Sequence, residues 1–209
     1  MPTEHLTEPP MIAILRGVLP ERCVEVAEVL YRAGIRAIEV PLNSPDPYAS
    51  IAALSAHFDN KCLIGAGTVL SAMDVQRTRD AGGRLIVAPN VDTEVIHNGL
   101  QLGLEVVPGI ATATEAFLAI RAGATRLKLF PAATYGPHHL KALKSVLPKN
   151  VMVFPVGGIG AQDVKPWLEA GADGFGFGSE LFRPTFGLAQ IEQRARELVA
   201  AVAAGKAGI

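Results

Sequence analysis

The sequence predicts an α/β protein in which eight βα units form one compact (β/α)8 TIM barrel. Three observations favour this fold class. A helix-like segment, a glycine and a strand-like segment recur along the chain. The strand-like runs are apolar throughout, as in parallel strands that are buried on both faces. No long excursion interrupts the succession of units, which favours closure into a barrel. An open doubly wound sheet is the main competitor, and periodicity alone does not exclude it.

Five of the units carry a glycine between the helix and the strand: Gly34, Gly82, Gly103, Gly123 and Gly171. Glycine adopts the left-handed conformation that ends a helix at little cost, so each of these glycines marks a step from helix to strand. The glycines are separated by 48, 21, 20 and 48 residues. Each gap of 48 residues should therefore hold one further unit.

Eight apolar runs and eight helix-like intervals fit this repeat. The strands are expected near residues 11–16, 35–40, 62–67, 84–88, 104–107, 125–130, 151–156 and 173–178, and the helices near 20–33, 46–57, 71–81, 92–101, 112–122, 137–147, 161–170 and 187–203. Ser71 suits a helix N-cap, Thr112 and Glu115 suit a capping box, and Pro137 suits a first helical turn.

The chain length of 209 residues allows one sizeable core but is below the roughly 250 residues typical of this barrel. We therefore expect one domain over residues 11–209 with few loop insertions, preceded by a loosely ordered lead-in over residues 1–10. The lead-in lacks a charged segment followed by an apolar one. No run approaches the roughly 18 apolar residues of a membrane-spanning helix.

The composition points to a small-molecule partner. The formal net charge is −1 and no basic run is present, which favours neither nucleic acid nor an anionic membrane. Apolar residues make up 49% of the chain and charged residues 19%, which suits a buried α/β core. Cys23 and Cys62 lack CxxC spacing and are expected to be buried or inert thiols, consistent with a cytoplasmic location.

Polar residues and glycines follow the predicted strands, at the barrel end where such enzymes place their chemistry. They are Arg16, Glu39, Thr68, Asn90, Lys128, Gly157, Gly158, Gly178 and Ser179. The fifth strand is expected to end at Pro108-Gly109, which would shape the rim of the barrel without offering a titrating group.

Lys128 is the candidate nucleophile. Alternation in its strand puts Leu127 and Leu129 on one face and Lys128 with Phe130 on the other. A buried lysine either pairs with a carboxylate or loses its proton more readily, and a neutral amine attacks carbonyl carbon to form an imine. The alternative is a lysine whose apolar stem is buried while its ammonium reaches solvent.

Glu39 has the same pattern on another strand, sharing a face with Ala37. Two ionisable residues that meet inside one barrel mouth predict a nucleophile and a proton shuttle. The alternative is a buried Lys–Glu pair that only balances charge.

Glycine turns after the last two strands predict a phosphate site, built from backbone N–H groups at Gly157, Gly158, Gly178 and Ser179. Gly178 could instead be a space-filling residue, together with the other glycines of its strand. No complete nucleotide-binding motif occurs, and the histidines have no metal-ligand spacing, so we expect no metal.

Five segments together resemble the class I aldolases that cleave 2-dehydro-3-deoxy-6-phospho sugar acids. The segments are Ile12-Ala-Ile-Leu-Arg-Gly17, Glu39-Val-Pro-Leu-Asn-Ser-Pro45, Ile64-Gly-Ala-Gly-Thr-Val69, Lys128-Leu-Phe-Pro131 and Val156-Gly-Gly-Ile159. The resemblance runs from about residue 11 to 185. It implies a homotrimeric barrel without metal or other cofactor that yields pyruvate and glyceraldehyde 3-phosphate.

The resemblance also implies a role for each site residue. Lys128 is similar to the Schiff-base lysine and Glu39 to the general acid/base. Arg16 and Thr68 resemble the groups that hold the pyruvate carboxylate, while the four residues of the glycine turns match the phosphate site.

Three residues are candidates for substrate specificity: Asn43, Asn90 and Val156. The phosphogluconate members of the family usually carry arginine in place of Asn43 and threonine in place of Val156. This chain is more similar to the phosphogalactonate members, whose substrate differs in configuration at C4. We therefore expect a preference for the galactonate epimer, with a gluconate or dual-epimer aldolase as the alternative.

Two readings outside the aldolases also fit a phosphate-binding barrel. An isomerase or epimerase would use Glu39 and Lys128 as acid and base without an imine, and a sugar-phosphate binding protein would bind without turnover.

Overall fold

The computed structural model describes residues 10–207, which form a parallel α/β fold. The strands are β1 (Met11–Ile14), β2 (Ala37–Pro41), β3 (Leu63–Gly67), β4 (Leu85–Val87), β5 (Glu105–Val107), β6 (Gly109–Ile110), β7 (Arg126–Leu129), β8 (Met152–Pro155) and β9 (Phe175–Phe177). The helices are α1 (Pro20–Ala33), α2 (Pro47–Phe58), α3 (Ala72–Asp80), α4 (Thr93–Gln101), α5 (Ala113–Arg121), α6 (Ala132–Lys144), the 3-10 helix η1 (Ala161–Asp163), α7 (Val164–Glu169) and α8 (Leu188–Ala207).

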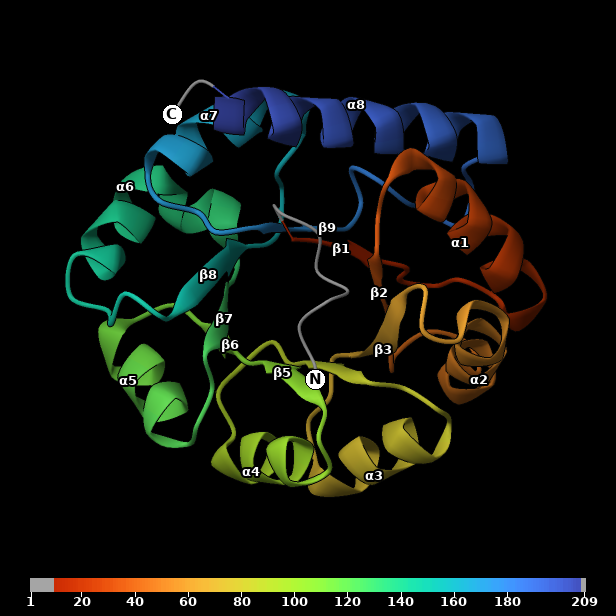
Figure 1. Cartoon of the computed structure of the whole chain (residues 1–209), viewed down its shortest axis with the longest axis horizontal. Coiled ribbons are helices and arrows are strands. Elements are labelled where there is room, and N and C mark those ends of the chain that lie inside the picture. Colours follow the sequence, from red (N-terminus) through yellow and green to blue (C-terminus); the bar gives the residue numbers. More distant parts are fainter. Residues whose placement is uncertain (1–9, 208–209) are drawn as a thin grey trace.

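The strands curl into the centre of the molecule and the helices surround them (Figure 1). One sheet has the strand order β5-β4-β3-β2-β1-β9, and the other has the order β6-β7-β8. All neighbouring strands within these two sheets pair in parallel. Only Pro108 separates β5 from β6. At the other seam, Val156 after β8 forms a parallel bridge with Gly176 of β9.

Each strand has two buried faces, as its apolar composition predicts. One face packs beneath the helices in the main core, where Ile38, Leu127 and Leu129 are fully buried. The other face forms a separate inner cluster of Ile12, Ala37, Leu63, Leu85, Val87, Val107 and Phe154. A polar residue on the inner face is therefore enclosed by several strands at once.

The glycine repeat is confirmed by the backbone. Gly34, Gly82, Gly103, Gly123 and Gly171 all have positive φ angles, between 71° and 110°. After α1, the N–H of Gly34 donates to carbonyls of the last helical turn. These left-handed turns release the chain from each helix into the next strand.

The predicted helix starts are also confirmed at α3 and α5. The Ser71 hydroxyl accepts from the Asp74 N–H at 3.2 Å. Thr112 and Glu115 form a reciprocal capping box at the start of α5. Both contacts satisfy backbone donors that the first helical turn leaves without a partner.

Two predicted boundaries are confirmed, and each has a neighbouring element that was not predicted. β5 ends at Val107, within the strand predicted near residues 104–107, but after Pro108 the chain pairs again as β6, where Gly109 lies opposite Lys128. Pro108 lacks an N–H, yet its carbonyl accepts from the Lys128 N–H at 2.8 Å. α6 begins at Ala132, but Gly136, with φ 76° and ψ 167°, is not helical, so a second helical part starts at Pro137 as predicted.

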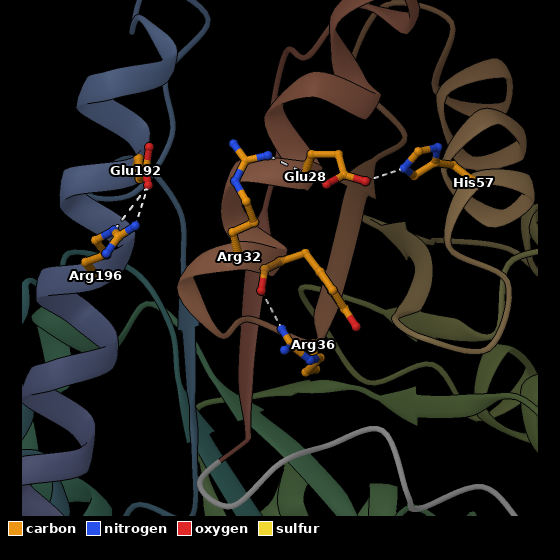
Figure 2. Close-up of polar contacts among 7 residues, drawn as sticks. Glu28, Arg32, Arg36, His57, Glu192 and Arg196 are labelled. Carbon is orange, nitrogen blue, oxygen red and sulfur yellow. Dashed lines mark hydrogen bonds and ion pairs between the residues drawn. The ribbon is translucent and has the colours of Figure 1, made fainter.

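Several ion pairs lie on the outer surface of the helices (Figure 2). Glu28 of α1 contacts Arg32 one turn away and His57 of α2, and Arg196 pairs with Glu192 on α8. The lead-in predicted over residues 1–10 lies outside the described residues except for Pro10, which is buried. Within residues 10–207, no helix combines the length and the hydropathy needed to cross a membrane.

Candidate active site

Lys128 faces the interior of the curled sheet from the third position of β7. Its neighbours in register are Gly109 and Phe154, and only 6% of the residue is exposed. Its Nζ lies 4.8 Å from the centre of the Phe130 ring. Burial lowers the pKa of Lys128 below its usual 10.5, Glu39 counteracts this shift, and Arg16 adds to it. The amine is therefore neutral more often than a surface lysine.

Glu39 faces the same interior from the third position of β2. It is 1% exposed, and among the described residues its Oε2 atom has no hydrogen-bond partner. Burial raises the pKa of Glu39 to about 7, although the charges of Lys128 and Arg16 lower it. Gly67 of β3 leaves room for this carboxyl group, since a Cβ there would overlap with it. Glu39 can therefore exchange protons near neutral pH.

Arg16 follows β1 at the same edge of the sheet and is exposed. Its positive charge lowers the pKa of both Glu39 and Lys128, so its guanidinium lies within electrostatic reach of the two groups. Nη1 of Arg16 donates to Oδ1 of Asn43 at 2.5 Å. This contact places Asn43 beside Arg16.

Lys128 and Arg16 border a cavity of about 470 Å³ at the carboxyl ends of the strands. Lys128, Arg16, Phe130 and Val156 contribute to its wall. The predicted phosphate residues Gly157, Gly158, Gly178 and Ser179 line it as well. The structure thus brings together residues from four separate strand ends.

The two glycine turns present backbone N–H groups at the cavity. Gly157 and Gly158 have φ angles of 102° and 71°, and a Cβ at Gly158 would lie 2.8 Å from Ala133 Cβ. The hydrogen bonds found within residues 10–207 include none donated by the N–H groups of Gly158 or Ser179. These donors are free to bind a phosphate group.

Four predicted site residues do not line the cavity: Glu39, Thr68, Asn90 and Asn43. Thr68 follows β3 in a left-handed conformation with φ 56° and is half-buried. Asn90 follows β4, is exposed, and its carbonyl accepts from the Gly109 N–H. Asn43 reaches the site through its contact with Arg16.

The sequence reasoning missed the segment that follows Ser179. Glu180, Phe182, Arg183 and Pro184 all line the cavity. Nε of Arg183 donates to the Ser179 carbonyl at 3.1 Å, and its guanidinium lies over the Phe186 ring, 5.6 Å from the ring centre. The sequence did contain a signal for Arg183, because this cation lies four residues after Ser179, a predicted phosphate ligand, in a turn before a helix.

Both cysteines and the tryptophan are buried, and three of the described histidines lie at the surface. Cys23 and Cys62 are free and fully buried, and burial raises the pKa of Cys62 to about 12. Trp167 is 3% exposed within the core, while His57, His97 and His138 are exposed. The described residues contain no cluster of three or more groups suited to hold a metal ion.

Comparisons with known proteins match nearly the whole chain. Residues 3–193 match the family model described as KDPG and KHG aldolase. The 2-dehydro-3-deoxy-6-phosphogalactonate aldolase of Escherichia coli K12 is 44% identical over 93% of this chain and 95% of that protein.

Solved structures agree with these matches. A native KDPGal structure is 43% identical, with a TM-score of 0.93 over 95% of this chain and 96% of that one. KDPG aldolase from Legionella pneumophila, solved with pyruvate captured as a covalent carbinolamine, is 27% identical. Its TM-score is 0.80 over 96% of this chain and 95% of that one.

Proposed function

Because this chain belongs to the KDPG and KHG aldolase family, we propose that it cleaves 2-dehydro-3-deoxy-6-phosphogalactonate to pyruvate and D-glyceraldehyde 3-phosphate. The 44% identity to the Escherichia coli phosphogalactonate aldolase supports this substrate. The family assignment also replaces the isomerase and the non-catalytic readings with a carbon–carbon lyase. The single observation that carries the mechanism is a buried lysine at the wall of a cavity, within electrostatic reach of a buried carboxyl group.

Lys128 acts as the nucleophile. Its neutral amine adds to the C2 carbonyl to give a carbinolamine, which loses water to form an iminium ion. When a base removes the proton of the C4 hydroxyl, the C3–C4 bond breaks and its electron pair moves into the iminium. The aldehyde leaves and an enamine remains on Lys128. Protonation of the enamine at C3, followed by addition of water at C2, releases pyruvate and regenerates the amine.

Glu39 moves the protons in these steps. A carboxyl group with a pKa of about 7 is both an acid and a base at neutral pH, which suits a residue that must give and take protons within one cycle. Its Oε2 has no partner among the described residues, so the atom is free to contact a bound substrate or water.

Arg16 and Thr68 hold the carboxylate of the substrate. A guanidinium presents forked donors that match two carboxylate oxygens. The positive charge of Arg16 beside Lys128 and Glu39 supports its assignment to the pyruvate half of the substrate. The left-handed turn at Thr68 follows Gly67, which lies against Glu39.

The glycine turns bind the phosphate at the other end of the cavity. Backbone N–H groups of Gly157, Gly158, Gly178 and Ser179 supply donors, and Arg183 adds a positive charge. We expect Arg183→Gln to raise KM about tenfold for the phosphorylated substrate, equivalent to about 1.4 kcal/mol. Unphosphorylated 2-dehydro-3-deoxygalactonate serves as the control, because its KM should stay the same in the variant.

Asn43, Val156 and Asn90 set the preference between the C4 epimers. Val156 supports this assignment because it lines the cavity close to the phosphate turn. The 27% identity to a KDPG aldolase keeps the gluconate epimer as the second candidate substrate. A comparison of kcat/KM for the two epimers decides between them, and a higher value for the gluconate epimer would overturn the galactonate assignment.

Borohydride trapping tests the imine directly. Incubation with pyruvate and sodium borohydride should add reduced pyruvate to Lys128, detectable by peptide mass spectrometry. Lys128→Ala should lose both the adduct and the cleavage activity. Lys141→Ala is the matched control, because Lys141 is exposed on α6 and should keep both. An adduct that persists in Lys128→Ala would reject Lys128 as the nucleophile.

The quaternary state and the closure of the sheet belong to the same proposal. The short gap at Pro108 and the bridge between Val156 and Gly176 support a closed (β/α)8 barrel over residues 11–209. We expect a cytoplasmic homotrimer, as the family resemblance implies. Analytical ultracentrifugation measures the oligomer, and a monomer at micromolar concentration would contradict it.

A further inference from the structure

Two residues that follow β2 contact the segment that follows β1. Asn43 Oδ1 accepts from Arg16 Nη1 at 2.5 Å, and Ser44 Oγ accepts from the Gly17 N–H at 2.9 Å. Each pair is separated by 27 residues in the chain, so only the folded sheet brings the partners together. Neighbouring residues of one loop thus bind neighbouring residues of the other.

The Ser44 contact fixes the backbone of the β1 loop. Ser44 is 8% exposed, and its hydroxyl satisfies an N–H at a sharp turn, where Gly17 has a φ of 79°. A Cβ at Gly17 would lie 3.0 Å from Pro184 Cγ, so the turn is also enclosed from the side of the β9–α8 loop. The Cα of Arg16 is therefore held between three loops of the cavity rim.

The Asn43 contact holds the side chain of Arg16 itself. An arginine has several rotatable bonds and loses considerable freedom when its head group is held in one place. The Arg16 guanidinium donates one hydrogen bond to Asn43, and its other N–H groups can still donate to a second acceptor. Asn43 is exposed and does not border the cavity, so its amide acts on the site through Arg16.

We propose that Asn43 and Ser44 are positioning residues that hold Arg16 in the orientation that binds the substrate carboxylate. This inference rests on the proposed aldolase function. Asn43 then influences substrate choice through the placement of Arg16. The property that matters at position 43 is a hydrogen-bond acceptor, because a guanidinium can only donate.

The main test compares Asn43→Leu with the wild type in a double-mutant cycle with Arg16→Lys. Leucine has the same branched shape as asparagine, although it is larger, and it has no acceptor. We expect Asn43→Leu to raise KM about tenfold, equivalent to about 1.4 kcal/mol, with kcat within about threefold. In the Arg16→Lys background the same replacement should change KM by less than about twofold, because the interaction is already lost.

Ser44→Ala tests the backbone half of the inference. Loss of the hydroxyl should raise KM in the same direction as Asn43→Leu, and the melting temperature reports whether the variant still folds. A third readout is the pH dependence of trapping by pyruvate and borohydride. When Arg16 is released, its charge moves away from Glu39 and Lys128, so both pKa values should rise and the profile should shift to higher pH.

Three results would overturn the inference: an unchanged KM in Asn43→Leu, additive effects of Asn43→Leu and Arg16→Lys, or a loss of kcat without a change in KM. The wild-type protein separates these results from failure of the proposed function. If pyruvate cannot be trapped on the wild type, the aldolase assignment fails. If trapping succeeds and the cycle is additive, only the positioning role is rejected.

Discussion

Two pairs of buried charges differ in how closely their members meet. Glu105 and Arg126 begin β5 and β7, and Arg126 Nη1 donates directly to Glu105 Oε2 at 2.5 Å. Lys128 and Glu39 lie at the third positions of β7 and β2, and they share no hydrogen bond within the described residues. Both pairs include a residue of β7. Its first residue, Arg126, forms a direct ion pair, whereas its third residue, Lys128, does not.

The difference indicates which pair is structural. The direct ion pair joins the charged ends of both partners, although Arg126 Nε has no hydrogen-bond partner among the described residues and burial still raises the pKa of Glu105. A separated pair leaves the amine and the carboxyl group without full compensation, which shifts their pKa values toward the range where protons exchange. We therefore predict that the pair at the amino ends of the strands contributes to stability and that the pair near their carboxyl ends carries the proposed chemistry.

Glu39→Gln should have the largest effect on activity. Removal of a positioned general acid/base lowers kcat by about 10²- to 10⁴-fold. The free energy of unfolding should stay the same or rise, because a buried carboxyl group without full compensation is removed. Steady-state pyruvate release and urea denaturation measure the two effects, and a destabilised but active variant would make Glu39 structural.

Glu105→Ala should show the reverse. The Arg126 side chain, only 13% exposed, would remain largely buried without its partner, so we expect a loss of about 3 kcal/mol in unfolding free energy. The kcat/KM of the folded protein should change less than about twofold. The double variant Glu105→Leu/Arg126→Met is the matched control and should recover most of the stability. Failure of that recovery would mean that packing, and not charge, is lost.

The pH dependence of stability should also separate Glu39 from other acids. Its pKa is raised to about 7 in the folded state from 4.5, so the folded protein holds a proton that the unfolded chain releases. Stability relative to Glu39→Gln should therefore be lowest above pH 7 and rise as the pH falls toward 4.5. Parallel curves for the two proteins in denaturation at pH 5 and 8 would contradict the shift.

Arg196→Ala should have the smallest effect. Arg196 is 66% exposed in its pair with Glu192, one turn away on α8 (Figure 2). Exposed pairs at this spacing contribute about 0.3–0.5 kcal/mol. Thermal unfolding should detect little change, and a loss near that of Glu105→Ala would remove the distinction between exposed and buried pairs.

Much of the fold could be predicted because its signals are local. The five glycine stops and the caps at Ser71 and Thr112 depend on residues within a few positions of one another. The inward direction of Lys128 and Glu39 follows from strand alternation, which also needs only near neighbours. β6 and the short helical part of α6 before Gly136 were missed because they depend on contacts beyond the local pattern, such as the pairing between β6 and β7.

The site was predictable to a lesser extent. Lys128, Arg16, Val156 and the glycine turns meet in one cavity, as their places at strand ends suggest. Arg183 was missed because a loop residue has no periodicity to indicate its direction. The partner of Arg16 was hidden for a similar reason, since Asn43 and Arg16 meet only when β1 and β2 lie side by side.

The sequence by itself determined the order of the βα units, the positions of their turns, and which residues of each strand face inward. Backbone preferences and hydrophobic periodicity act over short distances along the chain, so a few neighbouring residues are enough to predict them. The tertiary structure alone decided that Glu105 pairs with Arg126, that Glu39 and Lys128 form no direct ion pair among the described residues, and that Asn43 accepts a hydrogen bond from Arg16. Such distances depend on how strands pack and register, which no local pattern encodes.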